Sequence, residues 1–376
     1  MTVVDVEIPI SPLDPINRSI LEVSEDQIHG FVREPVEEIA SRSGVPFAIV
    51  VERLQAMLGA GMLRRIRQTL TPNNLAHGAL IAWEIPRPLI EHAFDYLAQY
   101  DPFSGHVVIR SADGGNAAFG LWTTLKVPTG FSIEKHCRFL CYRLGAIRYH
   151  VMPPIRVFAL GVGHVRRRGI KVGEMAPRRA EAKQPSIVVL TDDEWLVLTE
   201  LKRDLDAGEI GAGIWRRRAE RAGIDPDTFV TVAERLDRKG LIGRFSTFLE
   251  HSKEIKGQPR LTEFNALFHW AVPPGREIEA GEEIGRFAIL THCYWREGGP
   301  ALNNVNIMAV AHGQSKQQVL AHKKAIDDHL DDLGIGFTFT TTYWGGRAEI
   351  KPSELSPAAY EQWCREMGID PAAMRG

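Results

Sequence analysis

Three residues in the second half of the chain alternate in a way that places an imidazole, a phenol and a guanidinium side by side. His292, Tyr294 and Arg296 occupy every second position of an apolar segment, and alternate residues of a strand point to the same face. Arginine grips carboxylates with a planar pair of N–H groups, and imidazole exchanges protons near neutral pH. We call His292, Tyr294 and Arg296 the row, and this combination of side chains predicts proton transfer beside a bound carboxylate. The alternative is that Tyr294 belongs to a sheet core and Arg296 is simply exposed.

A second histidine, His312, ends the next predicted strand. If that strand pairs with the first, His312 enters the same cleft as His292, and either imidazole can serve as the proton donor. Arg244 follows a predicted helix and would reach a ligand held between the helices and the strands. Each residue also has a plain structural interpretation, as a hydrogen-bonded core histidine and a surface arginine.

The elements that must position these residues occur twice. Residues 82–86 align with 269–273 at an offset of 187, and residues 120–126 align with 306–312 at an offset of 186. Upstream, positions between Val50 and Arg65 align at an offset of 179. Ordered windows at nearly constant spacing indicate an internal duplication.

The first copy keeps only part of the reactive set. His106 and Arg110 align with a histidine and an arginine of the second copy, whereas Val108 and Lys126 stand where the second copy has tyrosine and histidine. Three interpretations of these first-copy residues are open. They form a degenerate pocket, they act as carboxylate clamps (cationic side chains that hold substrate carboxylates), or they only line a surface. We therefore expect one working site per chain, centred on the second copy.

Each copy begins with helices and continues with alternating strands and helices. Residues 35–41 and 47–59 read as two helices around a turn at Gly44, followed by a basic wing, and the remainder follows the order β-α-β-β-α-β. The predicted fold class is α+β, with two tandem units that each consist of a winged helix-turn-helix and a ferredoxin-like domain. The predicted domains are a first winged helix (1–75), a first ferredoxin-like domain (76–163), a basic linker (164–185), a second winged helix (186–260), a second ferredoxin-like domain (261–350) and a C-terminal tail (351–376).

This architecture resembles the Lrp/AsnC family. Within it, Ile-Leu-Thr-His-Cys-Tyr-Trp-Arg at 289–296 and Asn-Ile-Met-Ala-Val-Ala-His-Gly at 306–313 are similar to the signature of siroheme decarboxylases, and Gly-Arg-Phe at 243–245 is similar to the sequence at their wing. The segment 300–306 departs from the Trp-Pro-Tyr-Asn that such proteins carry there.

The resemblance implies a tandem fused enzyme that decarboxylates acetate side chains of siroheme, or of a related tetrapyrrole, in heme or heme d1 biosynthesis. It implies no added cofactor and no metal-ligand set, with an iron tetrapyrrole as substrate or ligand. The catalytic residues would be His292, His312 and Tyr294, and the substrate-binding residues would be Arg244, Arg296, Arg110, His106 and Lys126.

The competing function is an Lrp/AsnC-type transcriptional regulator, with tetrapyrrole sensing as one form of that function. The expected recognition helices are poor in the residues that read bases: 47–59 offers Arg53 and Gln55, and 225–239 is rich in acidic residues. Specific DNA binding is therefore not expected, although the basic linker leaves it open alongside a solvated connection.

Composition sets the remaining expectations. The 376 residues carry a formal net charge of −2 and contain four cysteines, which favours a cytoplasmic globular protein without a disulfide framework. No apolar segment reaches the ~18 residues of a membrane span. The two copies should pack as a pseudo-dimer within the chain, and a homodimer is possible.

Overall fold

The computed structural model describes residues 8–71, 74–113, 118–161, 163–250, 254–257 and 260–376. The chain forms two compact units, each assembled from segments that are distant in sequence. Unit 1 comprises the described residues of 1–71, 161–170 and 188–263, and unit 2 comprises those of 72–160, 171–187 and 264–376.

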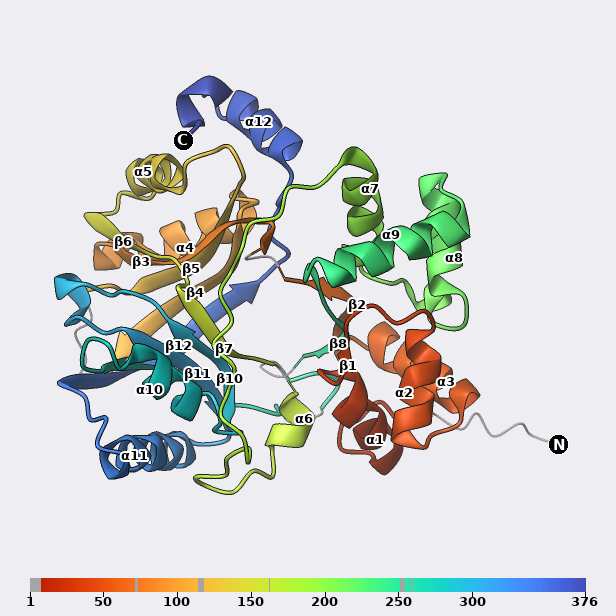
Figure 1. The fold of residues 1–376 in the computed structure, drawn as a ribbon, viewed down its shortest axis with the longest axis horizontal. Coiled ribbons are helices and arrows are strands. Elements are labelled where there is room, and N and C mark those ends of the chain that lie inside the picture. Colours follow the sequence, from red (N-terminus) through yellow and green to blue (C-terminus); the bar gives the residue numbers. More distant parts are fainter. Residues whose placement is uncertain (1–7, 72–73, 114–117, 162, 251–253, 258–259) are drawn as a thin grey trace. The chain divides into compact units, whose positions relative to one another are not determined.

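Unit 1 contains helices around a small antiparallel sheet of strand order β1-β8-β2 (Figure 1). In α3, Val50, Leu54 and Met57 are buried, at the spacing of one helix face, and Gly44 ends α2 in the left-handed conformation with φ 70°. The elements are α1 (Pro15–Ser24), β1 (Ile28–His29), α2 (Pro35–Ser43), α3 (Phe47–Gly59), β2 (Leu63–Leu70), α6 (His164–Arg167), α7 (Asp192–Lys202), η3 (Ala207–Glu209), α8 (Ile214–Ala222), α9 (Pro226–Arg238) and β8 (Ile242–Leu249).

Unit 2 is built on a nine-stranded sheet of order β6-β3-β5-β4-β12-β9-β11-β10-β7. We call β3 to β6 with their helices the first repeat, and β9 to β12 with theirs the second repeat. Each repeat runs β-α-β-β-α-β, and in each the fourth strand lies beside the first. The elements are β3 (Ala76–Glu84), η2 (Arg87–Leu89), α4 (Ile90–Gln99), β4 (Ser104–Ala112), β5 (Leu121–Pro128), α5 (Ile133–Leu144), β6 (Arg148–Met152), β7 (Arg156–Leu160), β9 (Phe264–Ala271), α10 (Glu277–Ile284), β10 (Leu290–Trp295), η4 (Pro300–Leu302), β11 (Ile307–Gly313), α11 (Lys316–Asp332), β12 (Phe339–Ile350), α12 (Pro357–Glu366) and η5 (Pro371–Met374).

The sheet must curl, because its two edge strands are almost consecutive in sequence. Only residues 153–155 separate β6 from β7, a connection that spans about 14 Å when extended. Nine flat strands would hold their edges about 38 Å apart. The repeats also pair directly at two equivalent places. β4 pairs with β12, and β10 pairs with β7, the strand that continues the first repeat after β6. The two halves therefore form one intramolecular assembly.

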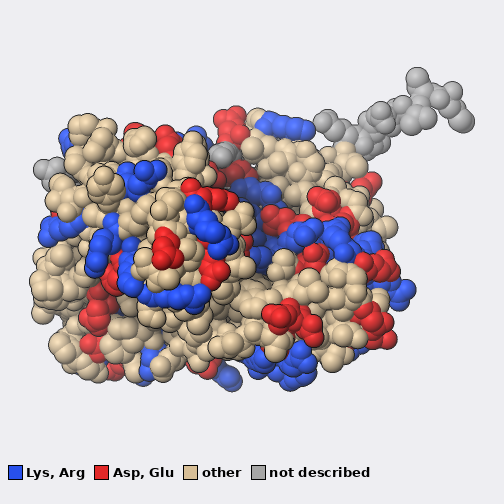
Figure 2. Space-filling model, turned by 90° about the horizontal axis from the view of Figure 1, so that it is seen from above, with Lys and Arg blue, Asp and Glu red and all other residues tan. Residues whose placement is uncertain are grey.

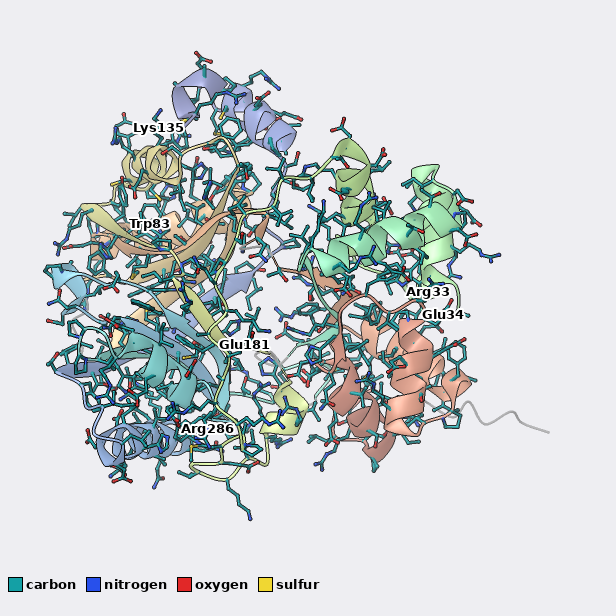
Figure 3. All side chains as sticks on the ribbon, viewed as in Figure 1. Arg33, Glu34, Trp83, Lys135, Glu181 and Arg286 are labelled. Atoms are coloured by element: carbon teal, nitrogen blue, oxygen red, sulfur yellow. The ribbon has the colours of Figure 1, made fainter. Side chains whose placement is uncertain are left out.

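Helices cover only one face of this sheet. The cores beneath them contain the fully buried Trp83 in the first repeat and Trp270 in the second, and Trp83 lies among the strands and helices of its repeat (Figure 3). We call the opposite face the inner face. Its buried apolar residues come from both repeats: Ala82, Val108, Phe119, Trp122, Met152, Leu267, Ala271, Leu302, Val305 and Met308.

Two segments differ from the simple domain boundaries expected from sequence. The final residues, for which a tail is expected, form α12 and η5, and Tyr360, Trp363 and Cys364 pack into the helix-covered core of the first repeat. In the basic linker, Arg166 and Arg167 pair with Asp26 in unit 1, while residues 171–187 belong to unit 2. The linker is therefore anchored rather than fully solvated. Among the described residues, no helix is both long and apolar enough to cross a membrane.

Candidate active site

Seven of the eight site residues predicted from the sequence lie in unit 2, on the inner face. On β4, Val107 and Ile109 enter the helix-covered core, so His106 and Arg110 point to the other side. On β5, Lys126 shares the side of Trp122, which lies in the inner-face cluster. The second-repeat residues His292, Tyr294, Arg296 and His312 are placed there by the contacts described next.

The row predicted on β10 is present. The rings of His292 and Tyr294 stack with centroids 6.1 Å apart, and the Arg296 guanidinium carbon lies 4.4 Å from the centroid of the Tyr294 ring. Cys293 points the other way, into the helix-covered core, where burial raises its thiol pKa. One face of the strand therefore carries imidazole, phenol and guanidinium in sequence.

Burial shifts the pKa values of Tyr294 and Arg296 in opposite directions. It raises the pKa of the Tyr294 phenol, a rise that the Arg296 guanidinium opposes, so the phenol keeps its proton at neutral pH. Burial lowers the pKa of Arg296 to about 10, which still leaves a full positive charge at neutral pH. Arg296 also donates a hydrogen bond to the Met152 carbonyl of the first repeat.

Thr291 connects the two predicted catalytic histidines. Its hydroxyl oxygen lies 3.0 Å from Nδ1 of His292 and 3.5 Å from Nδ1 of His312. The same hydroxyl donates to the Val310 carbonyl at 3.2 Å. The two imidazoles thus lie next to one threonine hydroxyl, on strands β10 and β11, which pair as predicted.

The first repeat contributes Arg110 to the same face. Its Nη1 donates to the Asn265 side-chain oxygen at 3.0 Å and to the Tyr343 carbonyl at 3.4 Å. The Asn265 side-chain nitrogen lies 2.8 Å from Nε2 of His312. Arg110, predicted as a carboxylate clamp, is therefore joined to a predicted catalytic histidine through one amide. Burial lowers the pKa of Arg110 to about 10.

Arg244 is the predicted site residue that lies outside unit 2. It is on β8, at the register position opposite His29, and its backbone N–H donates to the Thr69 hydroxyl at 2.8 Å. Burial lowers the pKa of its guanidinium, an effect that the carboxylates of Asp26 and Glu25 oppose. Its role as a substrate ligand stays a prediction.

The segment that departs from the expected Trp-Pro-Tyr-Asn forms a tight turn. It contains η4, and Asn303 and Asn304 both adopt φ 54°. Leu302 and Val305 are buried in the inner-face cluster. The altered residues therefore help to build the apolar wall of the face that carries the histidines.

Sequence reasoning missed four residues of this face: Asn265, His269, Thr291 and Tyr343. His269 is 1% exposed, its ring contacts Trp122 and Tyr343, and burial together with the nearby Arg110 lowers its pKa to about 3. Asn265 and His269 alternate along β9, and this spacing was the available signal. Recognising Asn265 as a partner of His312 also required the register that places them opposite each other.

Several polar residues of both expected recognition helices are engaged within unit 1. Arg53 pairs with Asp14 at 3.2 Å, and Gln55 donates to the Ala207 carbonyl at 3.0 Å. On α9, Arg235 and Lys239 both bind Glu194, at 3.0 Å and 2.6 Å. The face in Figure 2 shows acidic and basic side chains interleaved. The bonds of Arg53, Gln55, Arg235 and Lys239 hold these side chains against other parts of unit 1.

The loop before α2 adds a further constraint on α9. Arg33, labelled with Glu34 in Figure 3, forms an ion pair with Glu234 at 2.7 Å, and Asp237 accepts from the Phe31 backbone N–H at 3.1 Å. Two acidic side chains of α9 thus bind this loop.

Comparisons with known proteins agree with the motifs. Residues 262–333 match the family described as "AsnC-like ligand binding domain". The chain is 24% identical over 293 residues to "Siroheme decarboxylase" of Hydrogenobacter thermophilus, covering 77% of this chain and 80% of that one. It is 22% identical over 328 residues to "Siroheme decarboxylase NirDL subunit" of Paracoccus denitrificans, covering 84% and 92%.

Solved structures show the same fold. The crystal structure of the siroheme decarboxylase NirDL matches with a TM-score of 0.65 at 18% identity, covering 94% of this chain and 98% of that one. The co-complex of NirDL with an iron-uroporphyrin III analogue matches with a TM-score of 0.64 at 18% identity, covering 94% and 97%. The motifs, the relatives and the shared fold together lead to one conclusion: this chain is similar to siroheme decarboxylases in sequence and in fold.

Proposed function

We propose that the chain decarboxylates acetate side chains of siroheme, or of a related tetrapyrrole, in heme or heme d1 biosynthesis. The observation that carries the proposal is the gathering of His292, His312, Tyr294 and Arg296 on one face. The relatives named siroheme decarboxylase support it, as does a NirDL structure that holds an iron-uroporphyrin analogue.

The reaction needs few protein groups. A substrate side chain R–CH2–COO⁻ loses CO2, the electron pair of the broken C–C bond delocalises into the conjugated macrocycle, and one proton is added to give R–CH3. Arg296 is suited to hold a carboxylate, because guanidinium forms charge-assisted hydrogen bonds with it. Tyr294 keeps its proton and can donate a further hydrogen bond. Either His292 or His312 supplies the proton to carbon, and no added cofactor is required.

Several finer features belong to the same proposal. The chain is a tandem fusion of two copies, each a winged helix-turn-helix with a ferredoxin-like domain. The second repeat carries the working site. His106, Lys126 and Arg244 bind substrate carboxylates. The protein is cytoplasmic, and the two repeats serve as each other's partner, so a further copy of the chain is not needed.

The regulator alternative is less well supported, because Arg53, Gln55, Arg235 and Lys239 of the recognition helices are already bound within unit 1. Affinity for duplex DNA should be weak, without sequence preference, and steeply lost with salt. A footprint on a defined operator at physiological salt would reverse this ranking.

The direct test is anaerobic incubation with siroheme, followed by mass spectrometry of the tetrapyrrole. We expect loss of CO2 from acetate side chains, and visible absorption reports binding separately. Binding of siroheme without loss of CO2 would make the protein a tetrapyrrole carrier or sensor, with the altered turn at η4 as the leading cause.

A further inference from the structure

The hydrogen bonds of the inner face form a continuous row from the first repeat to the second: Arg110, Asn265, His312, Thr291 and His292. We infer that Asn265, oriented by Arg110, is a positioning residue that fixes the tautomer of His312, and that His292 is consequently the proton donor. The assignment of the donor rests on the proposed function, whereas the assignment of the tautomer does not.

The first step concerns the orientation of the Asn265 amide. Arginine has N–H donors and no acceptor, so the Asn265 atom 3.0 Å from Arg110 must be the amide oxygen. The amide nitrogen then has to face His312, whose Nε2 lies 2.8 Å away. A side-chain amide can normally be turned end over end without a change in shape, but here the guanidinium permits only one orientation.

The second step concerns His312 itself. An amide nitrogen donates and does not accept, so Nε2 of His312 must accept and carries a lone pair. The proton of the neutral ring is therefore on Nδ1, which faces the Thr291 hydroxyl at 3.5 Å. Protonation of Nε2 would set two N–H groups against each other, at a position separated from the Arg110 cation by one amide.

The third step concerns His292. The Thr291 hydroxyl proton is directed to the Val310 carbonyl, so the Thr291 oxygen accepts from Nδ1 of His292 at 3.0 Å. This Nδ1 proton is present in both the neutral and the imidazolium ring, and gain or loss of the second proton at Nε2 leaves the bond to Thr291 intact. Protonation of His312 at Nε2, in contrast, breaks its bond to Asn265.

The described cations of the inner face act on both rings in the same direction. Arg110, Arg296 and Lys126 disfavour a further positive charge on either imidazole. Tyr294 stacks on His292 and keeps its proton. The bond from Asn265 to Nε2 of His312 is therefore the contrast on which the assignment rests. Other titratable side chains of this face include His106, His150, His269 and Tyr343, and the ion pair between Glu84 and Arg148.

The test is NMR of the 15N-labelled full chain without siroheme, which reports the tautomer and charge of each histidine ring. In the wild type we expect His312 to be neutral with its proton on Nδ1 from about pH 6 to about pH 8. In Asn265→Asp, the new carboxylate accepts from both sides, so His312 should become an imidazolium. In Asn265→Ala, the two neutral tautomers should mix.

Two further variants distinguish the loss of the Asn265–His312 hydrogen bond from a general loss of folded structure. Arg110→Met leaves Asn265 in place but frees its amide to rotate, and we expect the His312 tautomers to mix there as well. Asn306→Ser is the matched control, because Asn306 is a buried asparagine of the same repeat whose side chain bonds the Val272 backbone, and it should leave the His312 signals unchanged. Melting curves verify that each variant is folded.

The activity assay adds an independent arm. Asn265→Asp should lower kcat for siroheme by about 10²-fold with KM little changed, because the reacting groups are displaced while the carboxylate clamps remain. A wild-type His312 that is an imidazolium at neutral pH, or that carries its proton on Nε2, would overturn the inference whatever the activity. An unchanged tautomer in Asn265→Ala would do so too. A wild type with the expected tautomer but no turnover would instead contradict the proposed function alone.

Discussion

The two repeats of unit 2 share a fold, a histidine and an arginine on the inner face, but differ at other polar positions of that face. The second repeat carries His292, Tyr294 and His312, whereas the first carries His106, Val108 and Lys126 at the aligned positions. Their arginines behave alike, since each reaches a backbone carbonyl of the other repeat: Arg296 that of Met152, and Arg110 that of Tyr343. The duplicated arginines thus link the repeats, while the second repeat alone holds the paired imidazoles.

The helix-covered face shows a similar divergence. Where β7 meets β10, Phe158 packs against α10 at Gly281, whose added Cβ would lie 2.1 Å from the ring. At the equivalent place beside β4, Arg347 lies over the Phe94 ring at 4.1 Å and pairs with Glu91 and Asp95. One junction is apolar and close-packed, and the other is an exposed ion pair. The junction at α10 is therefore the more closely packed of the two.

The largest expected effect compares the two aligned histidines. His292→Gln should lower turnover of siroheme by about 10²–10⁴-fold with the ligand still bound, because a general acid is lost. His106→Gln should cause a smaller loss that appears mainly in KM, as expected for a carboxylate clamp. Steady-state kinetics under nitrogen would check this, and equal losses in kcat would remove the distinction between the repeats.

The next effect tests the close-packed junction. Gly281→Ala should destabilise the protein by about 1–3 kcal/mol, because the Phe158 ring must move out of a filled core, even though alanine favours helix. Urea unfolding measures the change. Gly59→Ala is the control, because nothing lies within 4 Å of its added Cβ. A Gly281→Ala variant as stable as the wild type would show that this junction is loosely packed.

A pH effect should also be specific to the second repeat. His269, where the first repeat has Ala82, has its pKa lowered to about 3 by burial, so the native state excludes a proton that the unfolded chain binds below about pH 6.5. Stability therefore falls as pH falls from 6.5 toward 3, and at pH 5.5 this group alone costs about 1.4 kcal/mol relative to neutral pH.

Unfolding of His269→Leu at about pH 7.5 and about pH 5.5 measures that contribution. The variant should lose less stability than the wild type between the two values. Some acid sensitivity should remain, since burial also lowers the pKa of His322. An identical loss in wild type and variant would mean that His269 is protonated in the native state.

The smallest effect is expected at the exposed junction. Arg347→Met should cost less than about 1 kcal/mol, because ion pairs between exposed side chains contribute little and are screened by salt. The same urea measurement serves, repeated at high salt. A loss as large as that of Gly281→Ala would show that the two junctions are equally important for stability.

The sequence predicted much of this molecule because its signals are local. The strand alternation of His292, Tyr294 and Arg296 is a property of adjacent residues, and the repeat offsets give the order of the strands without any tertiary information. Asn265 could not be found in this way, because its role depends on the register of β9 against β11 and on Arg110 from a segment 155 residues away. The α12 helix was missed since its core contacts lie far from it in sequence.

The central claim is that one repeat carries the working site, and the number of tetrapyrroles bound per chain tests it most directly. Titration of the full chain with siroheme under nitrogen, followed by absorption, should saturate at one equivalent, and His292→Gln should still bind that equivalent without releasing CO2. Saturation at two equivalents, or release of CO2 by His292→Gln at the wild-type rate, would contradict the account.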